Sequence, residues 1–451
     1  MEETSQSVVV STSLDYQQKQ LSHSNYKLQR YVPLQGSLTY TLNNSRQQVQ
    51  FEIAGNELVN FSRSYFGCVL DIVAQGAANY SRVFRDVPPI SSVTVRTRSG
   101  QLLLDVDWAN FYSKVANRIA KKTSEYLSDG DRDLLVPNKG LATDAQSVRP
   151  TNGPANMPYL EPAYFQVSAI NTAQQVQYMI PLGSLVPESL FSMNKDIMFP
   201  ETVIITLNLA PLREIGCIGT GPTNPITGAG PLTGANTYSN TVLYIATEQN
   251  QVIKQQVASL IASGKFSMNL PYIHYYYNNR NGAGQQSISL RLNNAHGKRI
   301  NSVVHIPYNA VGTSHTVFDN VNALGLKVSQ FYTTVNNARQ LDFNQTCDDA
   351  TDTSLPTTSW LAVRDFLAGT VSAMNENIYL ANFFIYESFD DVAYADEKLP
   401  PLWNLTRGKD LGQEVKWDAV ITQTGGTNLD HYTYVRTTKT LTILPNLTTV
   451  M

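Results

Sequence analysis

Hydrophobic residues alternate with polar ones over many short stretches of this chain, which is the pattern of β-strands. The clearest example lies within residues 176–211, where a strand over 176–180 leads into a compact apolar corner around Pro187. A second strand follows over 203–209. Both of its faces are mostly apolar, so we predict that it is buried on both sides and ends at Pro211. This order predicts the point where an antiparallel sandwich passes from one sheet to the other.

The same alternation returns along the whole chain, interrupted by turn signals such as Ser99-Gly100 and Asn281-Gly282. The other predicted strands cover residues 49–53, 93–98, 102–106, 165–169, 241–245, 266–270, 272–277, 288–292, 300–306, 383–389, 415–421 and 441–443. About eight short strands in each half, separated by turns, are typical of antiparallel sandwiches. We therefore predict an all-β, mainly antiparallel chain with a few short helices, built as two consecutive sandwiches.

Three stretches show helical spacing instead. The first is predicted to begin at Asp107 as its N-cap, with Trp108, Phe111, Tyr112, Val115, Ile119 and Tyr126 on one face. The second has Thr247 as its predicted cap and Gly264 as its stop, and we predict that it joins two domains. The third covers residues 360–374.

Basic residues flank the apolar face of the first predicted helix, at Lys114, Arg118, Lys121 and Lys122. They indicate either an anion-binding helix or the solvated flank of an amphipathic helix that lies on a sheet edge. We favour the solvated flank, because such basic flanks are common on surface helices.

The two halves of the chain follow a similar order. Residues 1–30 are polar and rich in Gln and Ser, and we predict that they form an N-terminal arm. The first sandwich is predicted to cover 31–245 and the second 246–451, with a connecting helix at 246–264. Each half contains strand pairs, a helix headed by tryptophan and strands that end at proline, so we predict an architectural duplication.

Two stretches rich in Gly and Pro, 128–160 and 216–240, predict long exposed loops. The second has no lysine after its glycines, which excludes the usual phosphate-binding loop. The aspartates of 129–133 alternate as in a calcium loop, but Leu134 and Gly140 stand where that loop needs Gly and Glu. We therefore predict neither a nucleotide site nor a metal site in these loops.

The composition favours a protein with much of its surface covered by neighbours. Charged residues make up only 15% of the 451 residues, and tyrosine occurs 24 times. Charged residues are depleted and tyrosines enriched at the centres of protein interfaces. The net charge of −3 and the lack of a long Lys/Arg run argue against specific nucleic-acid binding.

Cysteine usage and the N-terminus bear on location. Cys68, Cys217 and Cys347 are widely spaced and form no CxxC motif, which indicates free thiols in a reducing compartment. The first residues, MEETSQSVVVSTS, lack the pattern of a signal peptide. No apolar stretch approaches the ~20 residues of a membrane span. We therefore expect a protein that is not secreted.

The residues capable of chemistry form no recognisable catalytic motif. A glycosidase needs two carboxylates in a cleft, and the candidates are Glu387, Asp390, Asp391, Asp396 and Glu397 in one stretch and Asp348, Asp349 and Asp352 in another. We interpret both groups as solvated turns. His274 and His305 fall in strand patterns, where a packed histidine is expected, and no HExxH motif indicates a metal. We predict no catalytic, cofactor-binding or metal-binding residues and no cofactor.

An aromatic run leaves one alternative function open. Tyr272, Tyr275, Tyr276 and Tyr277 could stack on sugars, which would make the chain a lectin-like carbohydrate- or receptor-binding protein. Half-buried aromatics on a sheet face explain the same run equally well.

Three stretches carry a resemblance to a known family. Residues 180–191, Pro200 and 202–209 form an apolar corner followed by a strand; the hairpin 93–106 runs into Trp108; and 294–309 contains a glycine turn, a basic pair and a strand. Their pattern and order resemble the double jelly-roll major capsid proteins of viruses. This lineage includes adenovirus hexons, tailless phages with an internal membrane, virophages and polinton-like viruses. The resemblance covers residues 35–445, and the short loops are closest to its smaller members.

The resemblance implies two consecutive eight-stranded jelly rolls in a structural protein that is not an enzyme. In this family three copies associate, and their six jelly rolls form a pseudo-hexameric capsomer that tiles the icosahedral shell of a DNA virus. The implied partners are other copies of the chain together with minor capsid and penton proteins. The implied location is the virion, after synthesis in the host cytosol or nucleus. Contact with an internal membrane stays open.

Overall fold

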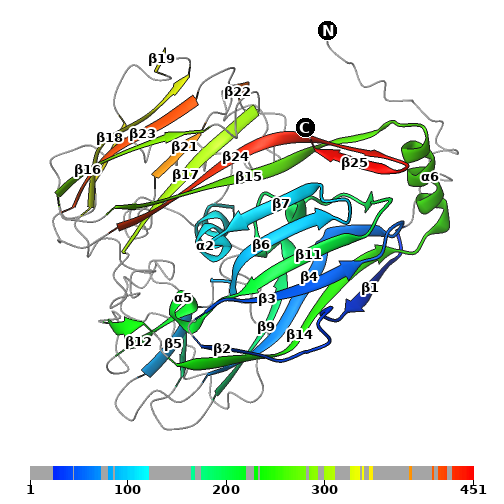
Figure 1. Cartoon of the computed structure of the whole chain (residues 1–451), viewed down its shortest axis with the longest axis horizontal. Helices are drawn as coiled ribbons and strands as arrows, with labels where there is room; N and C mark the ends of the chain where they lie inside the picture. The colour runs from blue at the N-terminus through cyan, green and yellow to red at the C-terminus, as the bar shows by residue number, and fades with distance from the viewer. Residues whose placement is uncertain are drawn as a thin grey trace, which may run out of the picture.

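Antiparallel strands make up most of the structure (Figure 1). The computed structural model describes residues 24–43, 45–72, 80–84, 87–120, 164–167, 174–219, 228–231, 234–280, 284–292, 299–309, 326–335, 338–339, 345–348, 385–388, 409–410, 415–423 and 429–450. Within these ranges, no helix is long and apolar enough to cross a membrane.

Two sheets form the sandwich in the first half of the chain. One has the order β1-β14-β4-β10, with β2 also paired to β14 and β9 to β4. Its strands are β1 (Tyr26–Tyr31), β2 (Tyr40–Asn43), β4 (Leu58–Ile72), β9 (Gln174–Pro181), β10 (Ile197–Met198) and β14 (Ala235–Glu248). The other has the order β3-β11-β6-β7. Its strands are β3 (Gln47–Ile53), β6 (Ile90–Thr97), β7 (Leu102–Asp107) and β11 (Val203–Leu209).

Two sheets form a second sandwich in the second half. One has the order β15-β24-β17-β21, with β22 paired to β17 and β25 to β24. Its strands are β15 (Phe266–Arg280), β17 (Arg299–Asn309), β21 (Ile385–Ser388), β22 (Lys409–Asp410), β24 (Leu429–Leu444) and β25 (Leu447–Val450). The other has the order β16-β23-β18-β19, with β20 paired to β18. Its strands are β16 (Gly284–Arg291), β18 (Leu326–Val335), β19 (Ala338–Arg339), β20 (Gln345–Asp348) and β23 (Val415–Gln423).

Strand order identifies both sandwiches as jelly rolls. To compare the order, each of four pairs of strands that lie in the same sheet is counted as one jelly-roll strand. These pairs are β1 with β2, β9 with β10, β19 with β20 and β21 with β22. The sheets of each half then read first-eighth-third-sixth and second-seventh-fourth-fifth in chain order. This is the double Greek-key order of an eight-stranded jelly roll. The predicted fold class and the predicted architectural duplication are therefore confirmed.

The apolar corner predicted within 176–211 does connect the two sheets of the first jelly roll. It passes from β9 through the short helices α4 (Leu182–Leu185) and η2 (Leu190–Ser192) to β10 and then to β11. A reciprocal hydrogen-bonded cap between Ser189 and Ser192 starts η2. β11 pairs with β3 on one side and β6 on the other, and most of its side chains are buried, as predicted.

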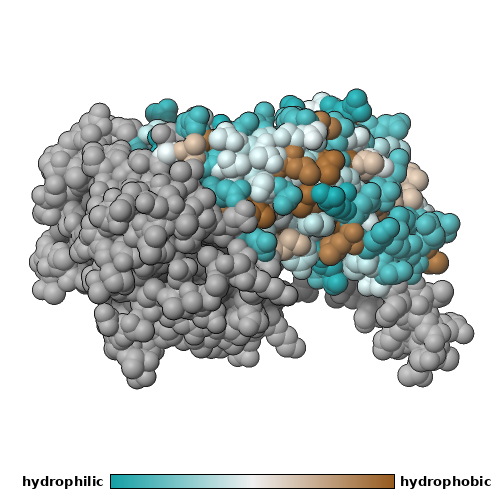
Figure 2. Space-filling view, turned by 90° about the horizontal axis from the view of Figure 1, so that it is seen from below, coloured by the Kyte–Doolittle hydropathy of each residue, from teal (hydrophilic) through white to brown (hydrophobic). Residues whose placement is uncertain are grey.

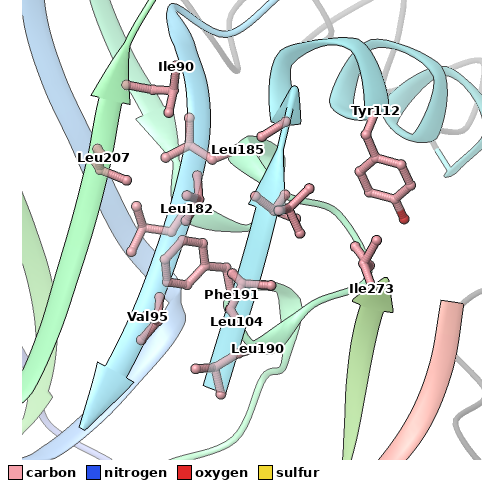
Figure 3. Close-up of a cluster of buried hydrophobic side chains, with 14 of the residues drawn as sticks. Ile90, Val95, Leu104, Tyr112, Leu182, Leu185, Leu190, Phe191, Leu207 and Ile273 are labelled. Carbon is pink, nitrogen blue, oxygen red and sulfur yellow. The ribbon is translucent and has the colours of Figure 1, made fainter. Parts of the chain in front are cut away.

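Side chains of this corner fill the centre of the first jelly roll. Figure 3 shows Leu182, Leu185, Leu190 and Phe191 beside residues of β6, β7 and β11, all of them buried. Burial of one such side chain stabilises a fold by roughly 1.5–3 kcal/mol. The same view shows Tyr112 and Ile273 at the border of this core, where the second jelly roll begins.

The stretch 216–240, predicted as a long exposed loop, contains strands, so that prediction is wrong. It holds β12 (Gly216–Gly219), β13 (Gly228–Pro231) and the start of β14. β12 and β13 belong to a fifth sheet of the described residues, with the order β13-β12-β5-β8, which also contains β5 (Tyr80–Phe84) and β8 (Tyr164–Val167). The glycine-rich composition led to the wrong prediction. Neighbouring strands satisfy the backbone N–H and C=O groups of such a segment, so it can form a strand without an alternating hydrophobic pattern. The other predicted loop, 128–160, and the aspartates 129–133 lie outside the described residues.

Two further expectations need correction at strand ends. Residues 26–30 were assigned to the arm, but they belong to β1, which pairs with β14 along its length. As an edge strand it leaves most of its side chains exposed, so it lacks the alternation of a half-buried strand. β14 also runs through the boundary predicted between 245 and 246 and ends at Glu248.

Two predicted helices are present with different starts. The first is α2 (Ala109–Ala120), preceded by Trp108 rather than capped by Asp107. The second is α6 (Gln251–Ala262), whose N-cap is Asn250 rather than Thr247; the Asn250 side chain accepts from the Val252 N–H. The helix predicted at 360–374 lies outside the described residues.

Helix α6 connects the two jelly rolls and lies at one end of the molecule (Figure 1). Glu248 fixes its start, because its buried carboxylate accepts from the backbone N–H of Asn25 and of Asn250, each at 2.8 Å. Gly264 ends it with φ +69°, a conformation that glycine adopts at little cost. The predicted stop at Gly264 is therefore confirmed.

Candidate functional site

Strand β24 is buried on both faces, and each face serves a different jelly roll. Because strand side chains alternate, His431, Thr433 and Val435 face the core of the second roll. Tyr432, Tyr434 and Arg436 face the first roll. All six are at most 3% exposed. The strand therefore forms part of a core and part of an interface at once.

Aromatic rings gather where the two rolls meet. We call this set the junction cluster: Trp108, Phe111 and Tyr112 from the first roll, and Tyr275, Tyr277, Tyr432 and Tyr434 from the second. The Tyr432 ring lies 5.1 Å from that of Trp108 and 5.2 Å from that of Phe111, and Tyr434 lies 5.0 Å from Tyr112. Such pairs contribute roughly 0.5–1.5 kcal/mol each beyond their buried area. The cluster thus holds the rolls in one relative orientation.

An unusual backbone conformation presents Trp108 to the second roll. Its φ is +52°, which bulky residues seldom adopt. The Asp107 carboxylate accepts from the Trp108 N–H at 2.8 Å, and the Tyr434 hydroxyl donates to the Trp108 carbonyl at 2.9 Å. Trp108 also stacks on Phe111, with ring centroids 5.3 Å apart. These contacts from both rolls offset the cost of the conformation.

Charged groups support the first-roll side of the junction. Arg46 forms ion pairs with Asp107 and Glu214, and its guanidinium lies 4.0 Å from the centre of the Trp108 ring. Glu214, in α5 (Leu212–Ile215), is buried and also accepts from Ser91 and Asn110 at 2.6 and 3.1 Å. Buried carboxylates are tolerated when several donors satisfy them, so this network positions Asp107 and hence Trp108.

A buried ion pair crosses the junction beside the aromatic rings. Glu188, in the apolar corner of the first roll, pairs with Arg436 of β24, and both side chains are only 3% exposed. Glu188 has φ +58°, so the turn after Pro187 is shaped to aim this carboxylate at the second roll. Breaking a buried pair leaves an uncompensated charge, which costs roughly 3–5 kcal/mol. This contact specifies how the two rolls dock.

The structure places the predicted aromatic candidates in packed positions. Tyr272 is buried, Tyr275 and Tyr276 are half-buried, and Tyr277 is 48% exposed. Tyr275 and Tyr277 belong to the junction cluster, with rings 5.6 and 5.4 Å from Tyr434 and Tyr432. Burial raises the pKa of Tyr275 and of Tyr434, so both phenols stay neutral at ordinary pH. These contacts support the interpretation as sheet aromatics.

One predicted solvated turn is instead part of a core. Glu387 lies in β21 and is 4% exposed, so its assignment to a solvated turn is wrong. Asp348 ends β20, and its side chain lies outside the described set. The other carboxylates in question, Asp349, Asp352, Asp390, Asp391, Asp396 and Glu397, lie outside the described residues. The predicted strand 383–389 already contained Glu387, so the strand prediction was the better guide to its position.

The remaining candidates occupy buried or undescribed positions. His274 is 7% exposed and His305 fully buried, as expected for packed histidines. Cys68 is a free, buried thiol, and burial raises its pKa, so it is unreactive. Lys114 and Arg118 belong to α2, but their side chains, like Lys121 and Lys122, lie outside the described set. Among the described residues, no three His, Cys, Asp or Glu side chains are grouped as a metal site would require.

Sequence reasoning missed most of the junction. It placed Trp108, Phe111 and Tyr112 on one helical face but did not identify Glu188 or the junction residues 432–436 of β24. A signal was present in 431–437, HYTYVRT, where large side chains occupy every second position. Period two over such a stretch predicts a strand with one bulky face.

Comparison with known proteins connects this fold to viral capsids. Neither models of protein families nor curated protein sequences match the chain. Among solved structures, the mavirus major capsid protein covers 94% of this chain over 90% of its own length, with 10% identity and a TM-score of 0.50. This chain has a double jelly-roll fold.

Two other structures show the same fold. A chain of the Sputnik virophage structure matches 95% of this chain over 88% of its own, with 10% identity and a TM-score of 0.54. The crystal structure of VP54 of the virus PBCV-1, fitted into a Sputnik reconstruction, matches 95% over 97%, with 11% identity and a TM-score of 0.51. The double jelly-roll resemblance seen in the sequence is therefore confirmed at the level of fold.

Proposed function

We propose that this protein is a structural major capsid protein. The observation that carries the proposal is the pair of jelly rolls with the same strand order, joined in one chain and locked by a buried junction. The mavirus major capsid protein has this fold along nearly its whole length. A shell subunit must keep two wall-forming units in a constant orientation, and the junction supplies that property.

The duplicated architecture suits assembly from three copies. Three chains with two similar jelly rolls each form a ring of six similar units, which packs in a near-hexagonal array. We propose that homotrimers form such pseudo-hexameric, hexon-like capsomers and that the capsomers tile the icosahedral shell of a DNA virus. The partners would be the same chain, neighbouring capsomers, and minor capsid and penton proteins.

Exposed apolar side chains support contact with neighbours. Large hydrophobic residues are at least 40% exposed at Leu28, Val32, Leu34, Val252, Leu260, Tyr277 and Leu447. Three of them belong to β1 and the segment after it, and two belong to α6. Figure 2 shows hydrophobic side chains scattered among hydrophilic ones on one face of the molecule. Interfaces between subunits bury apolar side chains behind a polar rim, so we propose β1 with the segment after it, and α6, as contact surfaces.

The proposal includes neither catalysis nor a specific nucleic acid. The buried residues of the junction and the cores have no access to a substrate, and the net charge is −3. We propose that the protein resides in the virion after synthesis in the host cytosol or nucleus.

Native mass tests this function most directly. Light scattering on the purified full chain should give about three times the chain mass of 50.0 kDa. Electron microscopy of the same peak should show hexagonal particles or shells. A monomer that persists at high concentration would contradict the proposal. Binding to a glycan array by that monomer would favour the carbohydrate-binding alternative.

A further inference from the structure

The two sheets of the first jelly roll have outer faces of different chemistry. On the sheet β3-β11-β6-β7, the side chains that point away from the core include Gln48, Gln50, Glu52, Thr94, Arg96, Asp105, Thr206 and Asn208. Several of them bond to one another: Thr94 donates to Asp105 at 3.0 Å, and Gln50 donates to Thr206 at 3.4 Å. A face of this kind is suited to contact with water.

The outer face of the other sheet is apolar at its centre. Because Phe66 and Cys68 of β4 point into the core, the residues between and beside them point outward. We call the outward set on β4, β9 and β14 the outer patch: Tyr65, Gly67, Val69, Met179, Val242 and Tyr244. Pairing of the strands brings these residues side by side, since Gly67 lies opposite Met179 on one strand and Val242 on the other.

The outer patch is a continuous surface. A Cβ added to Gly67 would lie 3.4 Å from Met179 Sδ and from Val242 Cγ2, and 3.5 Å from a ring carbon of Tyr244, so these side chains converge over the glycine. Tyr65, Val69, Met179 and Tyr244 are each partly exposed in the single chain. Charged residues lie at its margins, with Arg30 beside Tyr244 on β1, and Arg63 and Asp71 on β4. An apolar centre with tyrosine and methionine inside a charged margin is the composition of a protein interface.

The equivalent face of the second jelly roll is covered within the chain. β15, β24 and β17 hold the first, eighth and third strand positions there, as β1, β14 and β4 do in the first roll. Their outward side chains include Tyr275, Tyr432 and Tyr434 of the junction cluster, which pack against the first roll or beside that contact. The eighth strand therefore carries outward tyrosines in both rolls, and only in the second roll do described residues cover them.

The first roll covers that face with one particular side. β7 holds the fifth strand position and leads into Trp108, while β9 holds the sixth and leads into the corner with Glu188 (Figure 1). The ring contacts and the ion pair of the junction come from this side. In the second roll, β19 with β20 and β21 with β22 hold the same two positions, and Figure 1 shows β19 and β22 turned away from the first roll.

We propose that the outer patch binds the second jelly roll of another copy of this chain, through the side that carries β19 to β22. The inference rests on the proposed function, because it names the surface by which copies associate. The contact repeats between chains the arrangement that the junction creates within one chain. Patch and covering side are different surfaces, so the contact is heterologous and closes into a ring. Three copies then have six similar contacts, three within chains and three between them.

A charge within the outer patch should prevent association. Val69→Glu in the full chain alters a partly exposed position, so the fold should be retained, as circular dichroism can verify. Sedimentation over a dilution series should show association weakened by about tenfold or more, because an unpaired carboxylate is costly to bury. The matched control is Ile204→Glu, at a partly exposed apolar position on the polar outer face, between Glu52 and Arg96. It should associate like the wild type.

Cross-linking identifies the surface that the patch meets. A photoreactive benzoylphenylalanine replaces Tyr244 in the full chain, and isotope-labelled and unlabelled chains are mixed so that links between copies can be recognised by mass. Links to the second jelly roll of the other copy are expected. Links to its first jelly roll would overturn the proposal, since they would mean that two patches face each other.

Oxidation of the wild type tests the same contact without any variant. Hydroxyl radicals should oxidise Met179 several-fold more slowly in the associated protein than after dilution to single chains. Equal rates would overturn the inference, as would a Val69→Glu variant that associates like the wild type. In both cases the protein still associates, so the proposed function stands and only the surface is wrong. A wild type that stays monomeric at high concentration would contradict both proposals.

Discussion

The two jelly rolls have the same strand order but different cores. Phe51, Phe61 and Phe66 are among the largest buried side chains of the first roll. In the second roll, the space between the sheets holds Trp417 together with the buried pair His305 and His431. The strand order of a jelly roll depends on which strand positions are buried, and the same strand order occurs in both halves of the chain. The chemistry of the buried side chains can then diverge without changing the fold, provided that each polar group finds a partner.

This difference predicts how each roll responds to solution conditions. The hydrocarbon side chains of a core contribute a stability that does not depend on pH, because they do not titrate. A core with histidines and a carboxyl can depend on pH in either direction. The ion pair of Glu188 with Arg436 lies between the two cores, so the unfolding of one roll is coupled to that of the other.

The largest expected effect is a cavity in the first core. Phe66 is fully buried in β4, and Phe66→Ala should lower the free energy of unfolding by about 3–5 kcal/mol. The loss should be equal at pH 5 and pH 8. Urea unfolding at both values measures it, and Phe66→Leu is the control, with a smaller loss. A loss that changes by more than about 1 kcal/mol between the two pH values would contradict the expectation that the packing of Phe66 does not depend on pH.

The next largest effect concerns the ion pair across the junction. Arg436→Leu leaves the Glu188 carboxylate buried without its cation, so we expect a loss of about 3 kcal/mol. Adding Glu188→Leu removes the stranded charge and should restore most of that stability. Urea unfolding of the two single variants and the double variant gives the coupling. If the two losses simply add, the pair does not determine how the rolls dock.

The sequence predicted the fold through local patterns. Strands such as 203–209, the hairpin 93–106 and the stop at Gly264 are visible because burial on one or both faces dictates where apolar residues and turns occur. Edge strand β1 was missed, because with one neighbour it buries little and carries no alternation. The glycine-rich strands β12 and β13 were missed for a related reason, since backbone pairing alone does not require apolar side chains.

The junction and the buried polar side chains of the second core were much harder to predict. Glu188 and Arg436 lie 248 positions apart, and only the docking of the rolls brings them together. Glu387 looked like a member of an acidic turn because its charged neighbours dominate the local composition. A buried carboxyl or histidine is recognisable only when the side chains that surround it in space are known.

A moderate effect is expected from the aromatic part of the junction. Trp108→Ala removes ring contacts with Phe111 and Tyr432 and also the surface on which Arg46 lies, so the rolls should separate more easily. We expect a loss of about 2 kcal/mol and a second unfolding transition as the rolls become independent. Differential scanning calorimetry measures both. Tyr277→Ala, at the 48% exposed edge of the cluster, should retain a single transition. If both variants unfold in two transitions, the buried rings of the junction cluster hold the rolls together no more strongly than its exposed edge does.

The smallest effect concerns the connection between the two rolls. Gly264 has φ +69°, and a Cβ added there would meet only Leu444 Cδ2, at an ordinary 3.7 Å. Gly264→Ala should therefore cost about 1 kcal/mol from backbone conformation alone, with no steric clash. Gly264→Asn should cost less, because asparagine tolerates the left-handed region. Thermal unfolding of the two variants tests this order. Because α6 contributes no residue to the junction cluster or to the Glu188–Arg436 pair, neither variant should weaken the junction. An effect as large as that of Arg436→Leu would mean that α6 determines the orientation of the rolls.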